Sequence, residues 1–372
     1  MKRRMIALAL CLVLAAALFA GCGAKESPAP QQPEGTTDVS TQKPVSTETT
    51  AAAETPAPES TDETNTAAPT ETEKPAETEK PAELLVEVHP MLFRVTGQNG
   101  ETMYLFGTIH AGDSRMQTAL ERMKPFLDEC DALAVEFDTE AFKNDVAAQL
   151  DMMNFFYLTD GTTVSDHMPA ELYDRACVLL EEAGLPPQIM GIYNVAMWSQ
   201  LVEQAALMTR SDLDLENGMD TNLIKYCYET GKEVRDVESA QFQYELLAGF
   251  PEETSLLLIE HNLDSLDTCG EDLMKLYETW LGGNYEQIQA VALEEDEDAE
   301  EHYTAEQLAL LEDYSDQMLD QRNLGMRDRA VEWLASGDKV FFAVGAAHLV
   351  GEDGLAELLR AAGCTVEQVE YS

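Results

Sequence analysis

Short apolar runs, each bounded by glycine or other turn-forming residues, predict β-strands near both ends of the folded part of the chain. The runs 93–96 and 103–106 flank Asn99-Gly100, and Asn-Gly between two apolar runs is a strong signal for a β-hairpin. Apolar runs of the same kind predict further strands at 132–137 and 339–344. Residues 232–237 are expected to form a short strand, and residues 365–371 a closing strand.

Helical patterns fill the sequence between these strands. A first helix, capped by Asp113 or Ser114, is expected to run to about Cys130. Strands at both ends with helices between them predict an α/β fold, in which a mixed central sheet is built from N- and C-terminal segments and carries a large helical insertion. The further helical stretches are 141–231, 239–336 and 355–362, with breaks near Gly161, Pro186-Pro187, Pro251 and Gly282-Gly283 and an end at Gly363.

The N-terminus has the pattern of a secretory signal peptide. Three basic residues, Lys2 to Arg4, precede an apolar run that ends at Phe19 and is short for a membrane span. Ala20-Gly21-Cys22 resembles a bacterial lipobox, in which the cysteine is lipidated and becomes the first residue of the mature protein. We therefore expect residues 1–22 to be a lipoprotein signal peptide, the alternative being an ordinary signal peptide with a chance cysteine.

Residues 23–83 are rich in Thr, Pro, Glu, Ala and Ser and contain almost no large apolar side chains. Such a segment buries too little apolar area to offset the entropy of ordering, so it is predicted to be a disordered tether. Proline stiffens the tether and like charges extend it, which would hold the globular part, 84–372, away from a membrane surface. The predicted location is the extracytoplasmic face of the cell membrane, through a lipid on Cys22.

The formal net charge is −47, which limits the classes of partner. A strongly acidic chain is not expected to bind nucleic acid, because the phosphate backbone requires positive charge. It is also not expected to bind anionic lipid by peripheral electrostatic attraction. The acidic run 294–301 is interpreted as a solvated loop or helix end, and the spacing of the seven cysteines signals neither a disulfide framework nor a structural zinc site.

Two Gly-x-x-His sequences, ending at His110 and His348, each follow a predicted buried strand. If the two strands are neighbours in one sheet, both imidazoles lie at the same edge of that sheet. Imidazole is the commonest neutral ligand for divalent transition metals, so the pair is a candidate metal site. The alternative is that each histidine satisfies a buried hydrogen bond and organises its loop.

Two glutamates lie at the ends of other predicted strands. Glu136 sits in an apolar run, where a carboxylate is costly unless it is paired or bound to a metal. It could be a third ligand, a general base that activates water, or a partner that holds a histidine or arginine, and Asp138 would face the same side. Glu238 could line the same cleft or cap a helix beside Ser239.

Arg322 lies in a predicted helix and could bind a substrate carboxylate or carbonyl oxygen. The alternative is an ion pair with Glu136, Glu238 or Asp220, and Asp220 itself is expected to be structural.

Four other histidines match no motif and are expected at the surface: His89, His167, His261 and His302. The chain has no His-Glu-x-x-His, Gly-x-Ser-x-Gly or P-loop sequence, which excludes the common zincins, serine hydrolases and NTPases.

These motifs together resemble the TraB/GumN family, which includes the Tiki proteases. The resemblance covers nearly all of the chain from Leu84 onwards and includes both Gly-x-x-His motifs, the acidic strand with Glu136 and the pair Arg322-Asn323. Further matching sequences are Gly218-Met219-Asp220, Gly231-Lys232, Val237-Glu238 with Gln243 and Pro251, and Gly345 to Gly351.

The resemblance implies a TraB/Tiki/ChaN-like fold and a metal-dependent hydrolase, in particular a peptidase that acts on peptides or proteins. His110, His348 and Glu136 would bind a divalent transition metal (Mn, Co or Zn), and Glu136, Arg322 and Glu238 would be catalytic. Some TraB-type proteins reduce the activity of peptide pheromones, so a peptide binder without catalysis is an alternative. Haem or iron binding is a third alternative, because ChaN-like haem proteins are distant relatives in fold. The sequence carries no signal for an oligomeric state.

Overall fold

The computed structural model describes residues 87–294 and 299–371. The predicted signal peptide with Cys22, the predicted tether, and Glu295 to Asp298 of the acidic run lie outside the described residues. No described helix is long and apolar enough to cross a membrane.

A six-stranded mixed sheet in the order β4-β3-β5-β2-β1-β6 organises the described part of the chain. Strands β1 and β2 form the predicted antiparallel hairpin, in which Thr96 pairs with Thr102. Strands β4, β3, β5 and β2 are parallel to one another, and β6 is antiparallel to β1. The predicted α/β architecture is therefore confirmed. The strands are β1 Leu92–Thr96, β2 Thr102–Thr108, β3 Ala132–Val135, β4 Glu233–Asp236, β5 Val340–Gly345 and β6 Thr365–Gln368.

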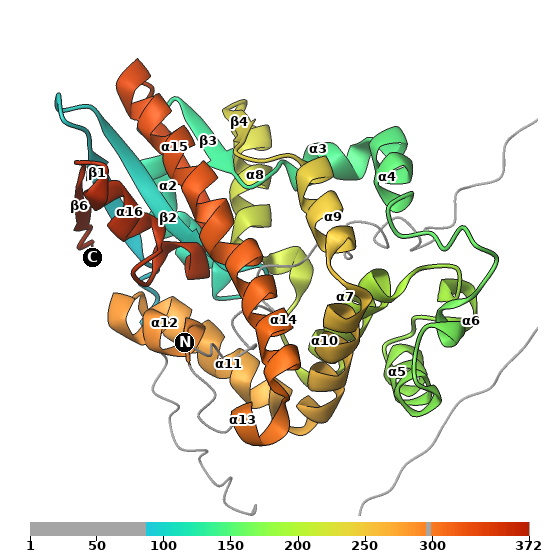
Figure 1. The fold of residues 1–372 in the computed structure, drawn as a ribbon. Helices are drawn as coiled ribbons and strands as arrows, with labels where there is room; N and C mark the ends of the chain where they lie inside the picture. The colour runs from blue at the N-terminus through green and yellow to red at the C-terminus, as the bar shows by residue number, and fades with distance from the viewer. Residues whose placement is uncertain (1–86, 295–298, 372) are drawn as a thin grey trace, which may run out of the picture. The chain divides into compact units, whose positions relative to one another are not determined.

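Helices cover both faces of the sheet and form the insertion (Figure 1). The first part of the chain contributes α2 Met116–Asp128, α3 Thr139–Asn144, α4 Val146–Met153, η4 Val164–Asp166, α5 Ala170–Glu182, α6 Pro187–Met190, α7 Val195–Arg210, η5 Leu215–Asn217 and α8 Met219–Thr230. The second part contributes α9 Ala240–Gly249, α10 Glu252–Asp264, α11 Leu266–Gly282, α12 Tyr285–Ala292, α13 Ala299–His302, α14 Ala305–Ser315, the π-helical η6 Asp316–Asp320, α15 Gln321–Ser336, η7 Ala346–Leu349 and α16 Leu355–Ala361.

The predicted helix breaks agree with the structure, but the predicted first cap is wrong. Pro187 is the first residue of α6, Pro251 precedes α10, and Gly283 ends α11 in the left-handed conformation. Helix α2 begins after Arg115, without a side-chain cap. The Asp113 carboxylate instead accepts hydrogen bonds from the Arg115 amide and from the Tyr277 hydroxyl, at 2.8 Å and 2.7 Å.

The alternation of side chains along the strands builds one core on each face of the sheet. On one face, Tyr104 and Phe106 pack against residues of α2, α8 and α11. On the other face, Met103 and Leu105 pack against residues of α12, α15 and α16. A third core, rich in residues of α5, α7 and α10, fills the helical insertion. The sheet is thus buried on both sides, and side chains at its strand ends are the ones left for chemistry.

Helix α11 ends against the entry to the sheet, where the backbone leaves no room for a side chain. Gly283 has a φ of +63°, and a Cβ atom there would lie 1.7 Å from the carbonyl oxygen of His89. The preceding Gly282 is exposed, and a Cβ atom would meet no atom within 4 Å. A side chain is therefore expected to be tolerated at Gly282 but not at Gly283.

We predict that Gly283→Ala lowers the free energy of unfolding by at least about 2 kcal/mol, because it combines backbone strain with a clash against fixed backbone. Gly282→Ala is the matched control and should change stability by no more than about 1 kcal/mol. Urea denaturation followed by circular dichroism measures both. Equal stability of the two variants would contradict the close approach of α11 to His89.

Candidate functional site

Four adjacent parallel strands end at one edge of the sheet, and each is followed by a residue that the sequence singles out. His110 follows β2, Glu136 follows β3, and Glu238 lies two residues beyond β4. His348 lies in η7, directly after β5. The carboxyl edge of a parallel sheet is a common position for ligand sites, and here it brings together residues from both ends of the domain.

His110 is held by the start of α8. Its Nδ1 atom lies 2.9 Å from Oδ1 of Asp220, and the Met219 amide donates a 2.7 Å hydrogen bond to the carbonyl of Ile109. Burial lowers the pKa of His110, but the Asp220 carboxylate and Glu136 outweigh burial and raise it to about 9. The Nε2 atom is buried and has no hydrogen-bond partner among the described residues. The expectation that Asp220 is only structural missed this contact.

His348 is completely buried and is held by a neutral partner. Its Nδ1 atom lies 2.7 Å from Oδ1 of Asn323. The amide group of Asn323 donates from Nδ2 to the carbonyl of Asp353, which fixes Oδ1 as the atom that faces the histidine. His348 therefore donates from Nδ1 and keeps a lone pair on Nε2, which has no partner among the described residues. Burial, together with Arg322, lowers the pKa of His348 to about 3, so the ring is neutral.

Glu136 presents one carboxylate oxygen to both histidines. Oε1 accepts a 3.0 Å hydrogen bond from the Gly345 amide and lies 3.9 Å from Nε2 of His348. A Cβ atom on Gly345 would lie 3.5 Å from this oxygen and 3.9 Å from Nε2 of His110. Burial raises the pKa of Glu136, but Arg322 and the two histidines outweigh it, so the net shift is downward and the group is ionised. Glycine at 345 thus lies beside all three candidate ligands.

Arg322 joins Glu136 to Glu238 in a buried ion-pair cluster. Its Nη2 atom donates to Oε2 of Glu136 at 2.6 Å and to Oε2 of Glu238 at 2.8 Å, while Nε donates to Oε1 of Glu238 at 2.9 Å. Gln243 donates from Nε2 to both carboxylates. Only 2% of the Arg322 side chain is exposed, which favours the ion-pair interpretation over direct contact with substrate.

Other predicted residues are not part of this cluster. Asp138 caps α3 through the Ala141 amide and accepts a hydrogen bond from Tyr228. Ser239, and not Glu238, caps α9. His167 contacts Glu252 and Thr162, and His261 contacts Tyr303.

A model of the TraB/PrgY/gumN family matches residues 91–368, about three quarters of the chain. The chain belongs to the TraB/PrgY/gumN family. It is similar to YbaP of Escherichia coli (strain K12), with 26% identity over 269 residues that cover 72% of this chain and 90% of the relative. YbaP of Shigella flexneri is 26% identical over 260 residues, which cover 69% and 87% of the two chains. No solved structure matches.

The chemistry of the donors in this TraB/PrgY/gumN protein fits a divalent transition metal. Two imidazole Nε2 atoms are buried and have no partner within residues 87–294 and 299–371. Buried polar atoms are normally satisfied, so a ligand is the natural partner for them. Two donors on one tetrahedral ion lie about 3.4 Å apart, whereas Oε1 of Glu136 lies 3.9 Å from Nε2 of His348. In keeping with this, no group of three or more His, Cys, Asp or Glu side chains in the described ranges is arranged to hold a metal.

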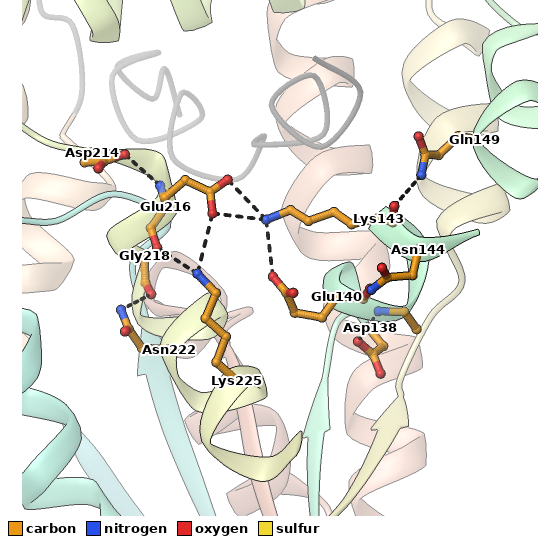
Figure 2. A network of polar contacts seen from close by, with 11 residues as sticks. Asp138, Glu140, Lys143, Asn144, Gln149, Asp214, Glu216, Gly218, Asn222 and Lys225 are labelled. Carbon is orange, nitrogen blue, oxygen red and sulfur yellow. Dashed lines mark hydrogen bonds and ion pairs between the residues drawn. The ribbon is translucent and has the colours of Figure 1, made fainter. Parts of the chain in front are cut away.

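A polar network braces the segment that carries Asp220 (Figure 2). Lys143 on α3 donates to Glu216 of η5 at 3.2 Å and to Glu140 at 3.3 Å, and Lys225 lies 3.5 Å from Glu216. Gly218 follows η5 and packs on the His110 loop so closely that a Cβ atom would lie 2.4 Å from the His110 carbonyl oxygen. The network thus links α3, which follows β3, to η5 and α8, although partly exposed ion pairs of this kind contribute little energy individually.

We predict that Arg322→Met costs about 3–5 kcal/mol of unfolding free energy, because two buried carboxylates would lose their shared cation. The matched control is Arg175→Met, which removes a partly exposed pair with Asp264 and should cost less than about 1 kcal/mol. Denaturant unfolding of both variants provides the measurement. A loss of similar size in both would mean that the buried cluster is not the stabilising element that its geometry indicates.

Proposed function

We propose that this protein is a metal-dependent hydrolase that acts on peptides or proteins. The observation that carries the proposal is the position of two imidazole nitrogens and a carboxylate oxygen at the edge of four parallel strands, where neither nitrogen has a hydrogen-bond partner in the part of the chain that the structure describes. The resemblance to the Tiki proteases, which use two Gly-x-x-His motifs and an acidic residue, supports the same reaction class.

His110 and His348 would hold the ion through Nε2, and Glu136 through Oε1. A bound divalent ion would polarise a carbonyl group and lower the pKa of a water molecule. Asp220 and Asn323 orient the two rings from their Nδ1 sides, as partners of metal-binding histidines commonly do. His348 is already neutral and ready to bind, whereas His110 must first release a proton.

Between the two roles open to Glu136, the contacts favour ligand over general base. Arg322 and Gln243 occupy Oε2, and the Gly345 amide occupies one lone pair of Oε1. These bonds hold the carboxylate in its ionised form, and Oε1 lies 3.9 Å from Nε2 of His348. Arg322 and Glu238 then act by positioning Glu136, without touching substrate.

The same contacts favour a second candidate function, which is peptide binding without cleavage. Both carboxylates at the strand ends, Glu136 and Glu238, are engaged by Arg322 and Gln243. No free general base is therefore supplied by these two residues. In that case the strand-end cluster would capture a peptide and leave its bonds intact.

We also propose that the protein acts outside the cytoplasm, anchored by a lipid on Cys22. The basis is the signal-like sequence and the Pro- and Thr-rich segment up to residue 83, which lie outside the described residues. Substrates would then be extracytoplasmic peptides or proteins, and the tether would set their distance from the membrane.

We predict that the purified protein binds about one equivalent of Mn²⁺, Co²⁺ or Zn²⁺ and that His110→Ala/His348→Ala abolishes this binding, because the two strongest donors are lost. His302→Ala, at an exposed histidine outside the cluster, is the control and should bind as wild type. Equilibrium dialysis with elemental analysis measures metal content.

Mass spectrometry of a peptide mixture, with and without a chelator, then separates the two candidate functions. Chelator-sensitive cleavage that disappears in the double variant supports the hydrolase, and retained but intact peptide supports the binder. Wild type and double variant with equally little metal and no effect on peptides would exclude the proposed site.

We predict that Asn323→Leu weakens metal binding by about 10–100-fold, because His348 loses the acceptor that fixes its tautomer. Asn323→Asp retains an acceptor oxygen toward His348 but loses the donor to the Asp353 carbonyl, so it should restore part of the affinity. Competition with a chromophoric chelator gives both constants. Equal loss in the two variants would show that packing, and not the hydrogen bond to His348, determines the effect.

A further inference from the structure

A hollow of about 480 Å³ lies in the helical insertion, between α5, α10 and α14. Its size falls within the range of about 300–1,000 Å³ that is common for ligand pockets. It shares no residue with the strand-end cluster. Its lining includes four buried or half-buried leucines, here called the floor, and four exposed glutamates, here called the rim. The leucines are Leu172, Leu256, Leu257 and Leu310, and the glutamates are Glu171, Glu253, Glu260 and Glu306.

Helix α10 supplies the central stripe of this groove. Leu256 and Leu257 lie between Glu253 and Glu260, so the four residues have the i, i+3, i+4, i+7 spacing of one helix face. The face therefore presents apolar contact area with a carboxylate at each end. Leucine from α5 and leucine from α14 extend the apolar floor on either side.

The rim carries unbalanced negative charge. The four glutamates are exposed, and none of them forms an ion pair within the described part of the chain. The one cation of the lining, Arg175, is already paired with Asp264, which lies outside the lining. The groove thus offers four free carboxylates around an apolar floor.

Favourable interaction with a helix dipole explains the positions of three of these carboxylates but not of the fourth. Glu171, Glu253 and Glu306 lie in the first turns of α5, α10 and α14, where a negative charge stabilises the helix. Glu260 lies near the C-terminal end of α10, where a negative charge is unfavourable. An external cation at the rim would offset this cost.

We propose that this groove binds a cationic amphipathic peptide helix from another protein. Its apolar side chains would lie on the leucine floor, and its Lys or Arg side chains would pair with the glutamate rim. Binding of an amphipathic helix in an apolar groove is a common recognition mode, and complementary charge sets its orientation and specificity.

The groove is separate from the histidine pair. Leu310 of the lining and Arg322 lie on the α14–η6–α15 segment, 12 residues and therefore about 18 Å apart at the rise of a helix. The proposal does not depend on metal binding or hydrolysis, so either function can fail without affecting the other.

Binding of a fluorescein-labelled Lys/Leu amphipathic helix of about 18 residues to the full-length protein, followed by fluorescence anisotropy, tests the proposal. We expect it to bind at least about tenfold more tightly than a Glu/Leu helix of the same pattern and than a scrambled Lys/Leu peptide. Glu253→Gln/Glu260→Gln/Glu306→Gln should weaken binding by at least about tenfold, and Leu310→Asn should weaken it by a smaller factor.

The control variant Glu229→Gln/Glu271→Gln/Glu286→Gln removes the same charge from exposed glutamates elsewhere and should bind as wild type, as should His110→Ala/His348→Ala. Equal weakening in the control variant would overturn the proposal, because it would show attraction to the acidic surface as a whole. Equal binding of the scrambled peptide would also overturn it. So would self-association in sedimentation that the groove variant abolishes, because a second copy would then fill the groove.

Discussion

The buried arrangement of one arginine between two glutamates is the constraint on which the candidate site depends. Desolvation of Glu136 and Glu238 is costly, and Arg322 makes it tolerable only because its guanidinium donates to both carboxylates at once. A lysine has no planar fork and could not reproduce this geometry. The result is an ionised Glu136 whose Oε1 atom lies 3.9 Å from Nε2 of His348. The Nε2 atoms of His348 and His110 have no hydrogen-bond partner among the described residues.

Topology supplies the rest of the site. Strand β5 lies between β3 and β2, so the chain must return from the helical insertion to the middle of the sheet before the second Gly-x-x-His reaches the first. Parallel pairing then fixes the relative height of the strand ends, for example Gly107 with Val344. A ligand set that spans more than 200 residues of sequence is thereby positioned by the rigid centre of the fold, and the loops only orient the side chains.

The site residues that the sequence could identify are those at strand ends. A polar residue at the end of a buried apolar run adds nothing to the packing of the strand and is costly to bury, so it is a candidate for a functional role. This applies to His110, Glu136 and His348. Asp220 could not be identified as a site residue in this way, since an acidic residue in the first turn of a helix already has an ordinary stabilising role. Asn323 has a polar side chain in a helix, and its partner is identified only when α15 packs beside η7. The role of such residues is determined by contacts between helices and strands and not by the local sequence pattern.

The π-helical segment η6 changes the direction in which side chains point between α14 and α15. Its wider turn, in which the Gln321 amide donates to the carbonyl of Asp316, adds one residue to the repeat. One extra residue rotates the following side chains by about 100° relative to a continuous α-helix. Arg322 comes immediately after this segment, and its Nη1 donates back to the carbonyl of Met318 within it. The π-helical turn therefore directs Arg322 to the buried carboxylates, while α14 before it faces the helical insertion.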